Sequence, residues 1–154
     1  MKGIVTINTD ASYHSEFKVG AYAFWIVSDM GRICMSGAFK ERVKNPSEAE
    51  IQCILNAIHV FKKQRIKDIY KIIVNTDSLN AIHIFKNDKQ QIKRWGLKWG
   101  DGYREKFNKM GLSKIIEFRH VKAHKETSTA RSWVNDWCDK SAKEQLWKKI
   151  NNTN

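Results

Sequence analysis

The chain has 154 residues, the length of a single domain, and its 42% hydrophobic and 11% aromatic content supplies one apolar core, which excludes intrinsic disorder. Its longest clean apolar run, residues 21–27, is far shorter than the roughly 20 residues of a membrane span. Lys and Arg number 28 against 16 Asp and Glu, and the resulting formal charge of +12 favours a polyanionic partner, most simply nucleic acid.

The first third of the chain reads as strands. We expect β-strands at residues 3–8, 19–28 and 32–39, with a hairpin turn at residues 29–31 joining the last two into an antiparallel meander. A helix follows, because apolar residues recur at helical spacing from Ile51 to Phe61 and basic residues close the segment at 62–65.

Strands and helices alternate in the rest of the chain. A nearly continuous apolar run at residues 69–75 predicts a strand buried on both faces, followed by helices at about 79–86 and 102–110. A strand at 114–121 and a helix at about 132–150 complete the order. The pattern predicts an α/β domain whose mixed sheet has an antiparallel part and a parallel part, over residues 1–150, with a polar tail at 151–154.

Two of the expected strands end in the same tripeptide. Asn8-Thr9-Asp10 follows the first strand and Asn75-Thr76-Asp77 follows the fourth. If these strands are parallel neighbours, Asp10 and Asp77 meet at one edge of the sheet. Two carboxylates about 4 Å apart repel by about 4 kcal/mol at an effective dielectric of 20, so the pair needs a cation, and magnesium or manganese prefers such oxygen ligands. The alternative is that each aspartate merely ends its strand.

Other acids have competing explanations. Ser47 and Glu50 fit a capping box, with Ser47 as the N-cap, and Glu48 suits the first turn of a helix. In the last helix Asp136 and Asp139 are three residues apart and both lie near its start.

The sequence resembles the type 1 ribonuclease H family along nearly its whole length. Any one of the matching motifs is weak, but together they occur in the family's order on the expected elements. They are Thr9-Asp10-Ala11-Ser12, Gly20-Ala21-Tyr22-Ala23, Ala49-Glu50-Ile51, Asn75-Thr76-Asp77-Ser78, Val121-Lys122-Ala123-His124 and Asn135-Asp136-Trp137-Cys138-Asp139.

This resemblance implies a ribonuclease H-like fold, with a five-stranded mixed sheet flanked by helices. It also implies that Asp10, Glu50, Asp77 and Asp139 hold two Mg²⁺ ions, with Mn²⁺ as a possible substitute, and that His124 assists proton transfer or product release. The implied activity is hydrolysis of the RNA strand of RNA/DNA hybrids.

A basic and aromatic segment between Asp77 and His124 resembles the protrusion that some family members use to hold the hybrid; the alternative is a solvated helix whose tryptophans pack inward. The family's substrate contacts also map near the acids. The expected nucleic-acid contacts are Ser12, Tyr13, Asn45, Ser78, Lys93, Arg94, Trp95, Lys98, Trp99 and Lys122. Tyr13, Glu16 and Leu79 depart from the family's usual residues, so hybrid specificity is less secure than metal chemistry.

Two other functions stay open: a catalytically silent ribonuclease H-like module that binds nucleic acid or protein, and another metal-dependent nuclease of the superfamily. Neither a secretory signal nor a heptad seam is visible, and Cys34, Cys53 and Cys138 fit neither a disulfide framework nor a zinc ribbon. We therefore expect an intracellular, cytoplasmic monomer with reduced cysteines that uses neither a membrane nor a small-molecule cofactor.

Overall fold

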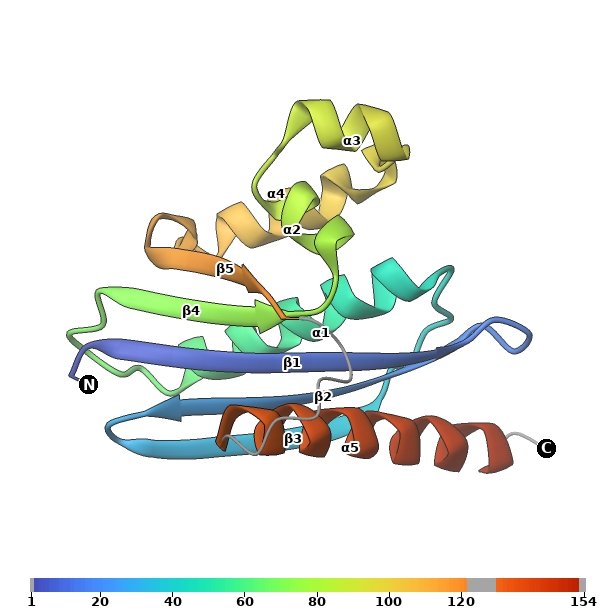
Figure 1. Cartoon of the computed structure of the whole chain (residues 1–154), viewed down its shortest axis with the longest axis horizontal. Coiled ribbons are helices and arrows are strands. Elements are labelled where there is room, and N and C mark those ends of the chain that lie inside the picture. The colour runs from blue at the N-terminus through green and yellow to red at the C-terminus, as the bar shows by residue number, and fades with distance from the viewer. Residues whose placement is uncertain (1, 122–129, 153–154) are drawn as a thin grey trace.

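A five-stranded mixed sheet forms the centre of the computed structural model, which describes residues 2–121 and 130–152 (Figure 1). The strand order is β3-β2-β1-β4-β5, with antiparallel pairs β1–β2 and β2–β3 and parallel pairs β1–β4 and β4–β5. The strands are β1 (Ile4–His14), β2 (Val19–Ser28), β3 (Gly31–Ala38), β4 (Lys71–Thr76) and β5 (Ile116–His120). The predicted division into an antiparallel and a parallel part is confirmed.

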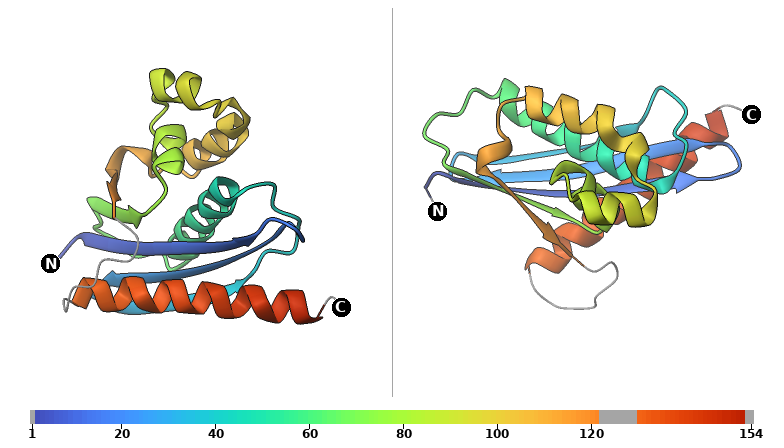
Figure 2. Two further views of the ribbon diagram at one scale, coloured as in Figure 1. Left: turned by 45° about the vertical axis from the view of Figure 1, so that its right-hand side comes forward. Right: turned by 90° about the horizontal axis from the view of Figure 1, so that it is seen from above.

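Helices cover both faces of this sheet. In Figures 1 and 2, α1 lies on one face, α5 runs along the opposite face, and α2, α3 and α4 gather on the side of β4 and β5. The helices are α1 (Pro46–Lys63), α2 (Leu79–Phe85), α3 (Lys89–Trp95), α4 (Asp101–Lys109) and α5 (Ala130–Asn152), with 3₁₀ turns η1 (Lys98–Gly100) and η2 (Ser113–Ile115). No helix in the described ranges is both long and apolar enough to cross a membrane.

Alternation of side chains along β1 separates two cores. Val5 and Ile7 are fully buried in the main core with the apolar face of α1. Residues of the other parity, including Asn8 and Asp10, therefore face the side that α5 covers. On α5 the residues that pack inward recur every four positions, as its buried face requires. They are Cys138, Ala142, Leu146 and Ile150.

Some predicted boundaries differ from the structure. β1 continues to His14, well beyond the predicted end at residue 8, because it pairs with β2 as far as His14 and Val19. β5 begins at Ile116, two residues later than predicted, and α5 continues through Asn152, so it includes two residues assigned to the tail. α3 was not predicted as a separate helix.

The cysteines are free thiols, as expected. Cys53 and Cys138 are buried, and Cys34 is exposed on β3. The Cys53 thiol donates to the backbone oxygens of Asp10 (3.3 Å) and Ala23 (3.4 Å), which ties α1 to β1 and β2 at the position of the first aspartate.

Candidate active site

The repeated Asn-Thr-Asp tripeptide has a direct structural explanation. Asn8 and Asn75 are register partners in the parallel β1–β4 pair, and the Asn75 amide donates to Asn8 Oδ1 at 2.9 Å. Thr9 Oγ1 donates to the Asn75 carbonyl oxygen at 3.2 Å. Each aspartate follows its asparagine by two residues, so this pairing brings Asp10, within β1, and Asp77, just after β4, to one region of the sheet.

Glu50 reaches the same region from α1. The alternative explanation of Glu50, a capping box with Ser47, is wrong: Asn45 is the N-cap, its Oδ1 accepting from the Glu48 N–H at 2.8 Å, and Pro46 occupies the first helical position. Ser47 Oγ instead accepts from the Asn80 amide at 3.0 Å. Proline at the first helical position, where no backbone donor is needed, shifts the cap two residues upstream. Glu50 is therefore free of a capping role and points into the fold.

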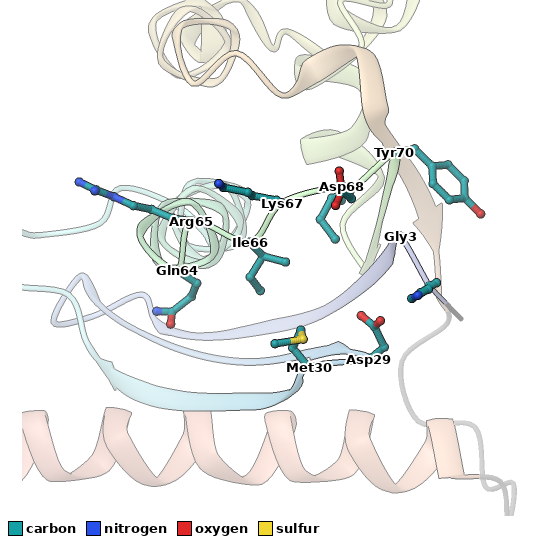
Figure 3. Close-up of a pocket in the computed structure, with 11 residues that line it drawn as sticks. Gly3, Asp29, Met30, Gln64, Arg65, Ile66, Lys67, Asp68 and Tyr70 are labelled. Atoms are coloured by element: carbon teal, nitrogen blue, oxygen red, sulfur yellow. The ribbon is translucent and has the colours of Figure 1, made fainter.

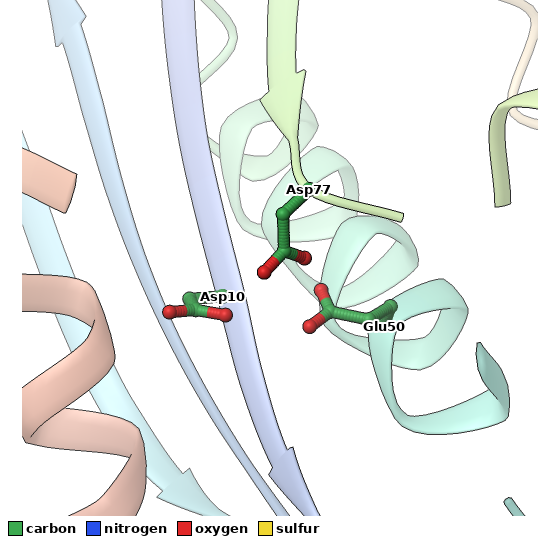
Figure 4. Close-up of side chains that lie close together, drawn as sticks. All are labelled: Asp10, Glu50 and Asp77. Carbon is green, nitrogen blue, oxygen red and sulfur yellow. The ribbon is translucent and has the colours of Figure 1, made fainter. Parts of the chain in front are cut away.

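The three carboxylates converge. Asp10, Glu50 and Asp77 each offer one oxygen, and these atoms lie within 4.8 Å of one another; Figure 4 shows the side chains arriving from β1, α1 and the segment after β4. The Ala11 N–H donates to both Asp10 Oδ1 (2.9 Å) and Glu50 Oε1 (3.1 Å), which fixes these two side chains relative to the strand.

The convergence raises the pKa values of Asp10 and Glu50. Burial, followed by the negative charges of Asp77 and Asp139, raises the pKa of Asp10 to about 7. Burial and the charges of Asp10 and Asp77 also raise the pKa of Glu50 well above its usual range. Carboxylates whose charged forms are so disfavoured need a proton or a cation.

The donor set fits a hard divalent cation. Glu50 Oε2 is buried and has no hydrogen-bond donor among the described residues, an arrangement that normally costs about 1–3 kcal/mol or more for a charged group. Glu50 also approaches Asp77 closely enough for a hydrogen bond, but only when one of the two carries a proton. Mg²⁺ and Mn²⁺ prefer carboxylate oxygens, so one cation would satisfy the unpartnered oxygen and neutralise the repulsion.

Asp139 lies at the border of this cluster. It is not among the three acids whose oxygens converge within 4.8 Å, but it lies close enough for its charge to raise the pKa of Asp10. Its Oδ2 accepts from Lys143 Nζ one turn later on α5, at 3.1 Å. Asp136, the alternative acid of the same helix, is exposed.

Comparison with known proteins identifies the family. The sequence matches the RNase H family model over residues 2–146. The chain belongs to the RNase H family. The resemblance to type 1 ribonuclease H, read from the motifs, is therefore confirmed.

Solved RNase H structures share the fold. The N-terminal RNase H domain of a Mycobacterium tuberculosis protein is 14% identical, with a TM-score of 0.73 over 99% of this chain and 100% of that chain. LC11-RNase H1, isolated from compost by a metagenomic approach, is 16% identical, with a TM-score of 0.68 over 96% and 99% of the two chains. LC11-RNase H1 in complex with an RNA/DNA hybrid is 15% identical at a TM-score of 0.63, over 95% and 99%. A search of curated proteins found no match.

The expected basic and aromatic contacts of this RNase H lie on α3 and η1, away from the sheet in Figure 1. α3 has no buried residue, and Asp88 caps its start while Gly96 ends it in a left-handed conformation. Trp95 and Trp99 are both exposed, and the Arg94 guanidinium carbon lies 5.3 Å from the centroid of the Trp95 ring. The alternative of inward-packed tryptophans is therefore wrong. The residues concerned are Lys93, Arg94, Trp95, Lys98 and Trp99.

The remaining expected contacts lie nearer the acids. Ser12 is half-buried on β1, and Tyr13 is packed partly against the main core. Asn45 and Ser78 cap helices: Ser78 Oγ accepts from the Ala81 N–H at 3.1 Å at the start of α2. The two cap residues thus position the entrances to α1 and α2 beside Glu50 and Asp77.

Lys122 and His124 lie outside the described residues. Another histidine, His120 at the end of β5, places Nε2 3.2 Å from the Asp77 carbonyl oxygen. Sequence reasoning left His120 without a role, and also missed the Ala11 N–H, because a backbone donor leaves no mark in the sequence.

A cavity of about 590 Å³ lies elsewhere on the domain (Figure 3). It is formed by the residues before β1, the β2–β3 turn and the loop from α1 to β4, with Ile66 and Met30 facing each other across it. Its position at the start of β1 is opposite to the end of β4 where the acids converge. No described cluster of metal-binding acids lines this cavity, so the acidic cluster is the candidate active site.

Proposed function

We propose that this RNase H hydrolyses the RNA strand of RNA/DNA hybrids, using two divalent cations held by Asp10, Glu50, Asp77 and Asp139. The observation that carries the proposal is the convergence of three carboxylates from β1, α1 and the end of β4, one of them with a buried oxygen that lacks a partner among the described residues. Two cations held in this way would activate a water and stabilise the leaving oxygen of the phosphodiester.

The residues around the acids hold the carboxylates in position. The Ala11 N–H orients Asp10 and Glu50, and the paired Asn8 and Asn75 hold the two strands in register. Burial of the cluster reduces competition from water and strengthens the interaction of each carboxylate with a cation. We include His124 as the proton-transferring group on the strength of its motif.

A hybrid is the substrate that the charge and the comparisons favour. The net charge of +12 suits a polyanion, and the cations and exposed rings of α3 and η1 suit phosphates and sugars or bases. The related LC11-RNase H1 binds an RNA/DNA hybrid. Recognition of the RNA strand would use its 2′-hydroxyls in the minor groove. Ser12, Tyr13, Asn45, Ser78 and Lys122 complete the proposed nucleic-acid contacts.

The test is a cleavage assay on labelled RNA/DNA hybrid, double-stranded RNA and double-stranded DNA, each with Mg²⁺, Mn²⁺ or chelator. We expect cleavage of RNA only within the hybrid and only with metal. Asp10→Asn and Asp77→Asn should abolish cleavage while leaving hybrid binding in place.

A matched control comes from α5. Asp136→Asn removes an exposed acid three residues from Asp139 and should leave cleavage unchanged, whereas Asp139→Asn should reduce it strongly. Binding of the hybrid by the unmodified protein without cleavage in either metal would overturn the proposal in favour of the silent module. Cleavage of double-stranded DNA would indicate another nuclease of the superfamily.

A further inference from the structure

Three aromatic side chains meet where β1 turns into β2. The ring of His14 lies 4.9 Å from that of Phe17 and 5.8 Å from that of Trp147 on α5, measured between centroids. Phe17 is 43% exposed and Trp147 is 52% exposed. Large apolar rings that gather at the surface indicate a binding surface more than isolated exposed rings do. We call His14, Phe17 and Trp147 the aromatic platform.

The platform is held in place by the fold. His14 pairs with Val19 across the hairpin, and the Phe17 N–H donates to His14 Nδ1 at 3.4 Å. Beside Trp147, Leu146 is buried against the sheet and fixes this turn of α5. The rings are therefore positioned before any ligand arrives, which lowers the entropy lost on binding.

The platform lies on the same side of the sheet as the candidate active site. Asp10 and His14 are four residues apart on β1 and share a face, at a separation of about 13 Å. Asp139 and Trp147 are eight residues apart on α5, about 12 Å along the helix axis, with Lys143 between them. β1 and α5 pack against each other, and both run from the acids toward the platform. We call the surface along these two elements the path.

The length and charge of this path suit a nucleic-acid strand. A strand that keeps the stacked rise of about 3.4 Å per nucleotide would cover about 12 Å in roughly four nucleotides. On the β1–β2 hairpin and on α5 beyond Asp139, exposed lysines outnumber the exposed acids Glu16 and Glu144. Two of these lysines form ion pairs along α5, Lys143 with Asp139 and Lys148 with Glu144. The charge that is left over is positive, which favours phosphates over a cationic ligand. The lysines are Lys18, Lys140, Lys143 and Lys148.

We propose that the aromatic platform stacks against an unpaired base of a strand that leaves the active site, roughly four nucleotides from the scissile phosphate. Bases inside a duplex are already stacked on both faces, so the ligand is a single-stranded extension of the substrate rather than its paired part. This inference rests on the proposed function and adds to it a preference for hybrids that carry such an extension.

The test compares hybrids with one extension of about six nucleotides on either end of either strand, each made with normal bases or as an abasic chain. Binding is measured by fluorescence anisotropy with the Asp10→Asn variant, so that no substrate is cut. We expect an extension at one of the four positions to tighten binding about tenfold relative to the blunt hybrid when it carries bases. The abasic chain at the same position, which has equal charge, should give no such gain.

Trp147→Ala and Phe17→Ala, each combined with Asp10→Asn, should remove this gain and leave binding of the blunt hybrid unchanged. The matched control is Trp133→Ala, which truncates an equally exposed tryptophan on the same helix, in contact with Trp25 instead; it should keep the gain. Equal binding of normal and abasic extensions, or a gain that survives both platform substitutions, would overturn the inference. Failure of the unmodified protein to cut a blunt hybrid would instead overturn the proposed function.

Discussion

Asp10→Asn should make the protein more stable in chelator while abolishing its activity. Burial and the neighbouring charges raise the pKa of Asp10 from 3.8 to about 7 in the folded state. At 1.36 kcal/mol for each pH unit, the ionised carboxylate then destabilises the fold by up to about 4 kcal/mol above pH 7. An asparagine side chain of the same shape carries no such charge.

The pH dependence of this effect has a definite sign. Between about pH 4 and 7 the folded state keeps a proton on Asp10 that the unfolded state has released, so rising pH lowers the free energy of unfolding. Below pH 4 both states are protonated and the contribution disappears. Glu50, whose pKa is also raised, adds to the loss in the same direction.

Urea unfolding in chelator at about pH 4.5, 6 and 8, values that span the Asp10 titration, measures this difference. We expect the free energy of unfolding of Asp10→Asn to exceed that of the unmodified protein by a few kcal/mol at the highest pH and by little at the lowest. Asp136→Asn, which replaces an exposed acid of α5 by the same amide, is the control for the substitution itself and should change the free energy of unfolding little. A stability difference that stays constant across this window would refute the electrostatic argument.

Three further predictions follow from the same structural features. Excess Mg²⁺ should stabilise the folded protein at about pH 8, because it binds the ionised acids of the folded state. At 100 times its Kd it should add about 2.7 kcal/mol to the free energy of unfolding, which calorimetry detects as a higher melting temperature. Asn45→Ala should lower the free energy of unfolding by about 1 kcal/mol, and Ser47→Ala by less, in urea titrations, because Asn45 is the cap of α1. Replacing Lys93 and Arg94 by alanine should reduce the salt dependence of hybrid binding by about 0.9 in slope for each phosphate that these side chains neutralise, and an unchanged slope would remove them from the interface.

The sequence predicted the mixed sheet and the acids best where several local signals agreed. The Asn-Thr-Asp repeat led directly to Asp10 and Asp77, because parallel neighbours place equivalent positions side by side. The role of Glu50 was ambiguous, because a glutamate three residues after Ser47 fits a capping box and can equally be a metal ligand. Only the observed cap at Asn45, and the hydrogen bond from Ala11, separate the two explanations.

The features that the sequence did not reveal depend on tertiary contacts. Polar residues after Asn8 suggested a strand end, but pairing with β2 extends β1 to His14. The helix α3 was missed because none of its seven residues is buried, so it has no apolar periodicity. The platform joins His14 to Trp147, 133 positions away, a contact that only the packing of α5 along β1 creates.

The claim that folding assembles a cation site is tested most directly by Mn²⁺ titration followed by electron paramagnetic resonance, on the unmodified protein and on Glu50→Gln and Glu48→Gln. The two glutamates lie two positions apart in α1 and are equally buried, 8% and 7% exposed, but only Glu50 faces Asp10 and Asp77. We predict saturable Mn²⁺ binding that Glu50→Gln weakens strongly and Glu48→Gln preserves. Equal Mn²⁺ binding by all three proteins would contradict the account.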